Sequence, residues 1–192
     1  MMHKNRILVI LAIVSISLIP AQAFAERIVS MDKALPTEKE KLMEVFSDLQ
    51  VYPQVLPKNI KSSTILNEEE NISKMTFKFK FITVDADVKF YSTSPDIVIL
   101  EVVSGDLKGT TLTGELTDLE NFQGSKGTNV KTDLDLKISW YLSLATTFIS
   151  DANIESMLDS SLDKFSIYAN NPQPSKTLEK EPEEKCFLMW CW

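Results

Sequence analysis

The most constraining feature of this sequence is a helical pattern that runs from Ile154 to Ala169. Apolar residues recur there at steps of three and four, which places them on one face of a helix: Ile154, Met157, Leu158, Leu162, Phe165, Tyr168 and Ala169. Charged and small polar residues occupy the other positions. Because a one-sided apolar stripe must be buried against another surface, we expect this helix to lie on the segment that precedes it.

The pattern from Ile72 to Trp140 predicts strands along almost the whole segment. Apolar and polar residues alternate from Met75 to Phe81, slip phase at Ile82–Thr83, and alternate again from Val84. Such a slip indicates a tight hairpin or a bulge, and we favour a hairpin. Three more strands are expected at 97–103, 110–119 and 130–140, separated by a glycine turn at 105–109 and a loop at 121–129. Because no connection between strands is long enough for a crossover helix, the sheet should be antiparallel.

The residues before these strands are expected to form a strand, two short helical segments and another strand. Residues 26–34 alternate loosely, and residues 60–66 form the second strand. Thr37 followed by Glu40 is a capping-box pattern for a helix that should end near Asp48. Two prolines break the turn at Gln50–Pro57. The sequence therefore predicts an α+β fold, in which a curved antiparallel sheet of about seven strands surrounds a long C-terminal helix, with two short helices after the first strand.

The first 25 residues have the pattern of an export signal. A short basic region precedes the apolar run Ile7–Ile19, which is too short to span a bilayer comfortably. Pro20 ends the run, and Ala23-Phe24-Ala25 supplies small residues at the two positions that a signal peptidase reads. We therefore expect an exported protein, secreted or held in the cell envelope or periplasm, whose mature chain starts at Glu26.

Charge and histidine content exclude several classes of function. The chain has 20 Lys and Arg against 27 Asp and Glu, and a formal net charge of −7, which argues against binding to nucleic acid or to anionic membranes. Its single histidine, His3, lies in the expected signal. The mature protein therefore lacks the imidazole that a Ser-His-Asp triad or a His-ligated metal site requires. We expect no catalytic residues of that kind, no bound metal and no cofactor.

Residues 171–192 are expected to be a charged linker followed by an apolar tail. The tail contains both cysteines, Cys186 and Cys191, which can pair with each other or with another chain. Three roles stay open for it: peripheral contact with a membrane interface, folding back to plug a cavity or bind a partner, or no role. The sequence does not decide the oligomeric state.

Two short motifs resemble those of a known superfamily. Residues Asp48 to Pro57 are similar to the Asp-x-x-x-Tyr-Pro-x-x-x-Pro stretch of coenzyme Q-binding START-domain proteins, and Gly105-Asp-Leu-Lys108 is similar to their glycine turn. Together with the order of elements over residues 26–170, these motifs resemble the START-like helix-grip (SRPBCC) superfamily, which includes polyketide cyclase/dehydrase-like proteins. One departure is the strand Thr111–Thr117, which lacks the aromatic residues often found there.

The resemblance implies a cavity between the sheet and the C-terminal helix that binds or transfers a hydrophobic small molecule, such as a lipid, an isoprenoid or a quinone-like compound. Two alternatives stay open: a cyclase or dehydratase that uses a pocket carboxylate or tyrosine, and a non-catalytic interaction module with a filled core. Binding is favoured over catalysis. The candidate ligand-binding residues are Tyr52, Phe77, Phe79, Phe90, Leu112, Gly114, Leu116, Leu134, Leu136, Phe148, Met157 and Phe165.

Overall fold

The computed structural model describes residues 25–79, 82–122, 124–138 and 150–172. Nearly all of the predicted signal, most of the predicted linker and tail, and Phe148 lie outside these ranges. The elements, in chain order, are β1 (Ala25–Leu35), α2 (Lys39–Ser47), α3 (Tyr52–Val55), β2 (Ile60–Asn67), β3 (Ile72–Phe79), β4 (Ile82–Ser94), β5 (Ile97–Val102), β6 (Thr111–Phe122), β7 (Ser125–Ile138) and α5 (Asp151–Asn170). Among the described residues, no helix is both long enough and apolar enough to cross a membrane.

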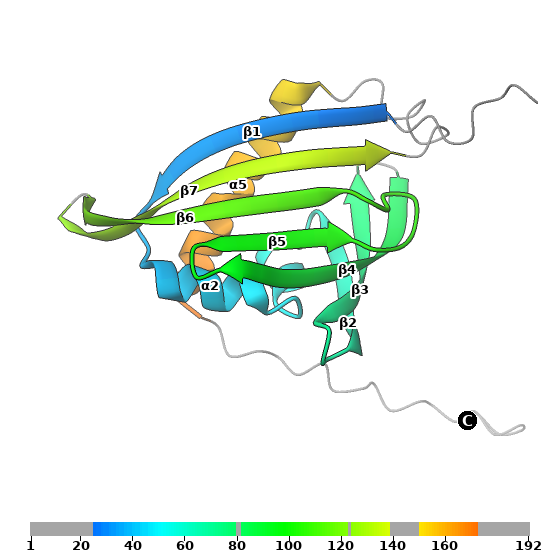
Figure 1. Cartoon of the computed structure of the whole chain (residues 1–192), viewed down its shortest axis with the longest axis horizontal. Coiled ribbons are helices and arrows are strands. Elements are labelled where there is room, and N and C mark those ends of the chain that lie inside the picture. The colour runs from blue at the N-terminus through cyan, green and yellow to red at the C-terminus, as the bar shows by residue number, and fades with distance from the viewer. Residues whose placement is uncertain (1–24, 80–81, 123, 139–149, 173–192) are drawn as a thin grey trace, which may run out of the picture.

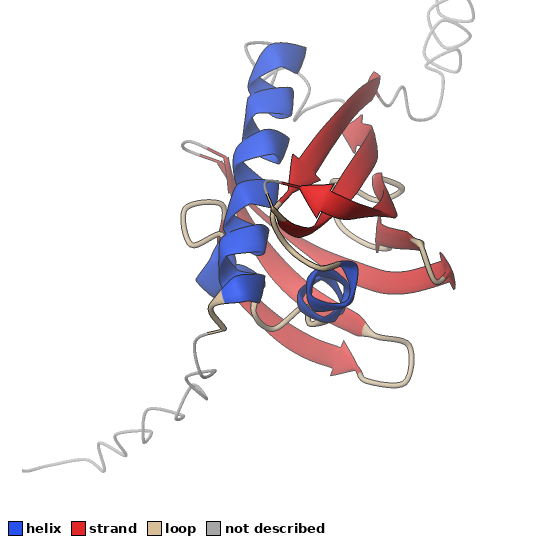
Figure 2. Cartoon of the chain, turned by 90° about the vertical axis from the view of Figure 1, so that its left-hand side faces the viewer, coloured by secondary structure: helices blue, strands red, loops and turns tan. Residues whose placement is uncertain are grey.

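Seven antiparallel strands form one curved sheet in the order β1-β7-β6-β5-β4-β3-β2. Consecutive strands from β2 to β7 are neighbours, and β1 joins the sheet beside β7, from Ala25↔Ile138 to Leu35↔Thr128. The helix α5 lies along the concave side of the sheet (Figures 1 and 2). The predicted α+β class, with a curved sheet around a long C-terminal helix, is confirmed.

Helix α5 begins slightly earlier than the apolar pattern predicted. Ser150 caps it, since its hydroxyl accepts a hydrogen bond from the Asn153 backbone amide at 3.3 Å. The buried positions of the helix are Ile154, Leu158, Leu162, Phe165, Ser166 and Ala169. The apolar ones lie three or four residues apart, as the sequence predicted, and Ser166 is an additional buried polar position beside Phe165. The C-terminal half of α5 packs against α2, whereas β1 is the only strand with extensive contacts to α5 among the described residues.

The predicted capping box at Thr37 is wrong. Helix α2 starts after Glu38, and no side chain caps it. The Thr37 hydroxyl instead lies 2.6 Å from the Ser166 hydroxyl of α5 and accepts a hydrogen bond from the Asn170 side-chain amide at 2.8 Å. Thr128 of β7 donates to the Thr37 carbonyl at 2.6 Å. Because Thr37 is only 1% exposed, its hydroxyl bonds to the buried partners that α5 provides.

The hairpin at the phase slip is confirmed, because β3 and β4 pair up to Phe79↔Ile82. The predicted loop at 121–129 is wrong, since β6 continues to Phe122 and β7 starts at Ser125. Gly127 makes this longer hairpin possible: a Cβ there would lie 2.7 Å from the Leu35 carbonyl oxygen. The glycine that suggested a loop instead permits close approach of neighbouring strands.

Candidate functional site

A cavity of about 630 Å³ lies between the concave face of the sheet and α5. Alternation along the strands directs every second side chain toward it, so the wall is mainly aliphatic and aromatic. Its size is within the range that ligand pockets in proteins commonly have, about 300–1,000 Å³. The strand residues with apolar side chains in the wall are Ile60, Met75, Phe77, Ile82, Val84, Val88, Phe90, Val98, Leu100, Val102, Leu112, Val130, Leu134, Leu136 and Ile138.

Three aromatic rings lie together at the α2–α3 side of the cavity. The Phe165 ring makes edge-to-face contacts with Phe46 and Tyr52, at centroid distances of 5.2 and 5.0 Å. The Tyr52 hydroxyl donates a hydrogen bond to the Phe46 carbonyl oxygen at 2.9 Å. Burial raises the pKa of the Tyr52 hydroxyl above its ordinary value, and the nearby Asp48 carboxylate raises it further. This hydroxyl therefore holds α3 against α2 in its protonated form.

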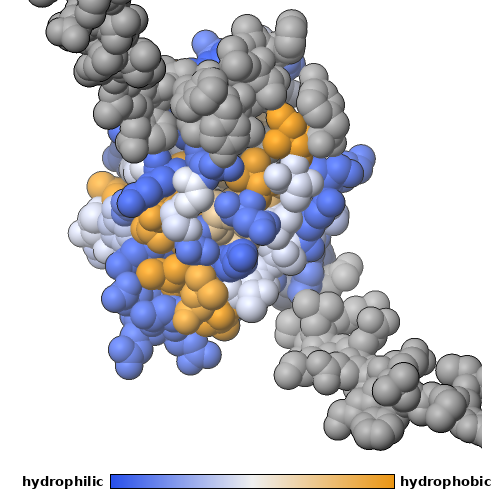
Figure 3. Space-filling view, turned by 90° about the vertical axis from the view of Figure 1, so that its right-hand side faces the viewer, coloured by the Kyte–Doolittle hydropathy of each residue, from blue (hydrophilic) through white to orange (hydrophobic). Residues whose placement is uncertain are grey.

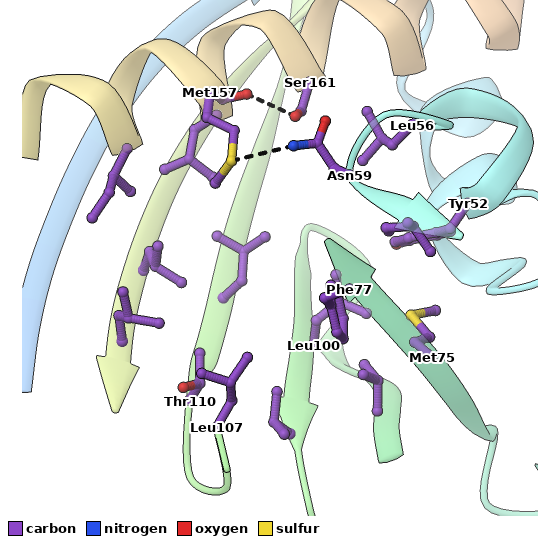
Figure 4. Close-up of a pocket in the computed structure, with 18 of the residues that line it drawn as sticks. Tyr52, Leu56, Asn59, Met75, Phe77, Leu100, Leu107, Thr110, Met157 and Ser161 are labelled. Carbon is purple, nitrogen blue, oxygen red and sulfur yellow. Dashed lines mark hydrogen bonds between the residues drawn. The ribbon is translucent and has the colours of Figure 1, made fainter. Parts of the chain in front are cut away.

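Polar residues lie where the wall meets solvent. Lys58, Lys78 and Asn153 belong to the wall and are exposed, so they mark the rim of the cavity near the first turns of α5. Asn59 and Met157 face each other across this rim, with the Asn59 side-chain amide 3.7 Å from the Met157 sulfur (Figure 4). Figure 3, which faces this end of the sheet, shows hydrophobic patches between hydrophilic ones. The cavity is therefore apolar inside and polar at one end.

The structure brings most of the candidate ligand-binding residues together. Nine of them contribute to the wall: Tyr52, Phe77, Phe90, Leu112, Gly114, Leu134, Leu136, Met157 and Phe165. The side chain of Phe79 and the whole of Phe148 lie outside the described part of the chain. Leu116 is not in the wall. It points to the concave side but is 1% exposed and belongs to the packed core at the end of β6 that α2 covers.

Sequence reasoning missed several residues of the wall. Met75 and Leu100 belong to apolar strand patterns, so only the position of the void distinguishes them. Leu107 lies in the glycine turn, which the sequence did not assign to the core. Asn59 lies in a loop that carried no signal. Arg27, on β1, was not recognised because charged residues are normally expected on the outer face.

The carboxylates of the central strands, which could be considered as catalytic acids or bases, lie outside the cavity. Asp85 accepts a hydrogen bond from the Thr76 hydroxyl at 2.7 Å, and Asp87 accepts one from the Ser104 hydroxyl at 2.5 Å. Neither residue contributes to the wall, and neither does Glu101. Over the described ranges, no cluster of His, Cys, Asp or Glu is arranged to bind a metal ion.

Comparison with solved structures identifies the architecture. A START superfamily protein from Mycobacterium smegmatis matches with a TM-score of 0.59 at 15% identity, covering 74% of this chain and 97% of that chain. The chain has a START-like helix-grip fold. Two plant proteins share this helix-grip fold. The major latex-like protein 151 of Panax ginseng has a TM-score of 0.56 at 12% identity (75% and 97% covered). The truncated norcoclaurine synthase of Thalictrum flavum has a TM-score of 0.55 at 13% identity (81% and 100% covered).

No protein-family model and no curated protein sequence matches the chain. At identities of 12–15%, the structural matches establish the fold alone. The function of the helix-grip domain must therefore be argued from its own cavity.

Proposed function

We propose that this protein binds or transfers a hydrophobic small molecule, which it holds in the cavity between the sheet and α5. The observation that carries the proposal is the void of about 630 Å³ with an almost wholly apolar wall. Protein interiors are normally close-packed, with few voids larger than a water molecule. A void of this size forfeits dispersion contacts that a bound apolar ligand would restore.

The chemistry of the wall favours binding over catalysis. A cyclase or dehydratase would need a titratable group in the cavity that can exchange a proton with its substrate. In the described part of the wall, Tyr52 is the only buried titratable side chain, and its hydroxyl already donates to a backbone carbonyl. Lys58 and Lys78 also belong to the wall, but they are exposed at its rim. The interaction-module alternative requires a filled core, which the cavity disfavours.

The ligand class we propose is a lipid, an isoprenoid or a quinone-like molecule. An apolar wall selects for apolar surface, and each buried methylene contributes about 0.8 kcal/mol before the costs of binding. A norcoclaurine synthase from Thalictrum flavum, with a TM-score of 0.51 to this chain, was solved in complex with dopamine and hydroxybenzaldehyde. This supports the view that a protein of this fold can accept small organic molecules.

We also propose that the protein acts after export. The support is the leader pattern of residues 1–25, in which a basic region, a short apolar run and Ala23-Phe24-Ala25 follow one another. N-terminal sequencing of the protein recovered from its producing cells tests this. A chain that starts at Glu26 supports export, and a chain that keeps Met1 overturns cleavage after Ala25.

Native mass spectrometry of the full chain, purified without detergent, tests the binding function. We expect an adduct with the mass of an apolar molecule, or stoichiometric uptake of a fluorescent fatty alcohol by the ligand-free protein. A matched pair of variants locates the site: Leu112→Trp, in the wall, should reduce uptake, whereas Ile28→Trp, on the exposed outer face, should not. Absence of both adduct and uptake overturns the proposal.

A further inference from the structure

The charged residues of the cavity wall are all of one sign. They are Arg27, Lys58 and Lys78, and no Asp or Glu contributes to the described wall. This contrasts with the whole chain, in which 27 acidic residues outnumber 20 basic ones. The cations also lie at the solvent-facing end of a wall that is otherwise mainly apolar. A positive rim around an apolar interior matches a molecule with an apolar body and one negative end.

Arg27 is the cation that faces the cavity most directly. On β1 it pairs with Leu136 of β7, and residues directly opposite each other on antiparallel strands point to the same face. Because Leu136 lines the cavity, Arg27 lies on the concave side as well. Its side chain is 27% exposed, so it is partly buried. An anion at this position would be bound at the boundary between the apolar interior and water.

One partner of Arg27 is a carboxylate on the rim. Arg27 Nη2 lies 2.6 Å from Asp151 Oδ1, in the first turn of α5, and the Asp151 side chain is 62% exposed. Ion pairs with an exposed partner contribute little to stability. A guanidinium carries five donors and can bind carboxylate or phosphate through two parallel hydrogen bonds. A ligand anion can therefore share the Arg27 guanidinium with Asp151 or take the place of Asp151.

We propose that the ligand is an amphipathic anion, an apolar chain that ends in one carboxylate or phosphate group, and that Arg27 at the cavity mouth binds the anionic group. This inference rests on the proposed binding function and specifies its ligand class. Lys58, at the rim, adds long-range attraction for the same charge. The apolar chain occupies the interior beneath α5.

Three probes with the same chain length separate charge from apolar burial: dodecanoic acid, dodecyl phosphate and 1-dodecanol. Their affinities are measured for the full-length protein by displacement of a fluorescent apolar dye at low and high salt. We expect at least one anion to bind the parent protein roughly tenfold more tightly than the alcohol. The more strongly preferred anion identifies the group as carboxylate or phosphate. The preference should shrink at high salt, because the rim is exposed.

The two members of the ion pair give opposite predictions. Arg27→Gln should abolish the preference for the anion, whereas Asp151→Asn should strengthen anion binding by up to about fivefold, since it removes a competing carboxylate. Arg27→Lys, which keeps the charge, should retain part of the preference. The control Lys126→Gln removes one exposed positive charge from the β6–β7 hairpin and should leave the preference unchanged.

The possible failures are distinguishable. If the parent protein binds the alcohol and the anions equally, the anion site is overturned while the apolar binding function stands. If Arg27→Gln and Asp151→Asn weaken anion binding alike, the ion pair only holds α5 to β1, and the anion site is again overturned. If none of the three probes binds, the proposed function fails.

Discussion

A homologous series of neutral alcohols measures the cavity directly. With about 30 Å³ for each methylene-sized group, a volume of 630 Å³ admits about 20 such groups. Chains from octanol to hexadecanol therefore lie within its capacity. Each added methylene should contribute about 0.8 kcal/mol, so four of them add about 3 kcal/mol, or roughly 200-fold in affinity.

A smaller cavity should stop the gain in affinity at a shorter alcohol. Leu112 lies opposite Leu100 on β5 and Leu134 on β7, and all three side chains line the wall. Leu112→Trp adds about six non-hydrogen atoms inside the void and leaves room for about 14 methylene-sized groups. It should therefore remove the gain from the last methylenes of hexadecanol while leaving octanol nearly unaffected. Titration calorimetry on the detergent-free protein provides the affinities, and Ile28→Trp on the outer face is the control.

Two results would refute this reasoning. One is an affinity that stays constant from octanol to dodecanol, which would mean that the added methylenes stay in water. The other is a Leu112→Trp variant that folds like the parent and binds the whole series unchanged, because the ligand would then lie elsewhere.

Three further predictions concern the frame around the cavity. Thr37→Val should lower the free energy of unfolding by about 1–3 kcal/mol in urea denaturation, because it leaves the buried Ser166 hydroxyl without its 2.6 Å partner. A change below the error of the measurement would contradict a stabilising role for the Thr37–Ser166 hydrogen bond. Gly105→Ala, in the β5–β6 turn, should destabilise the protein by more than about 1 kcal/mol, since φ at this residue is +81° and a Cβ would lie 2.5 Å from the Asp85 carbonyl oxygen. Thermal unfolding measures this loss of stability. An unchanged unfolding midpoint would contradict the expected backbone strain. Because the pKa of Tyr52 is raised in the folded protein, its hydroxyl ionises more readily in the unfolded chain. The stabilisation from keeping this hydroxyl protonated is therefore complete below about pH 10, and the free energy of unfolding falls as the pH rises further. Tyr52→Phe should make the fall in urea midpoint at alkaline pH smaller, and an identical fall in both proteins would contradict this.

Much of the architecture was accessible from local patterns. The alternation from Met75 onward and the stripe from Ile154 to Ala169 report which face of each element is buried, and the structure agrees with both. The phase slip correctly indicated the β3–β4 hairpin. These features are predictable because periodicity is a property of neighbouring residues and needs no knowledge of distant partners.

The residues that the sequence misplaced all depend on distant partners. Thr37 has a capping pattern, yet its hydroxyl bonds to Ser166 because the fold brings α5 beside it. Leu112 and Leu116 share one alternating pattern, but α2 covers the end of β6 where Leu116 lies, so only Leu112 faces the void. Local patterns cannot distinguish these two leucines.

The sequence by itself determined the elements, their buried faces and the antiparallel connections between β2 and β7. Tertiary structure alone decided that β1 lies beside β7, that the space beneath α5 is hollow, and that Arg27 faces it. The physical reason is that a packed core and a ligand cavity require the same apolar side chains on the same faces. Whether those side chains meet or leave a void depends on sheet curvature and on where the helices lie, and both are set by contacts between residues far apart in the chain.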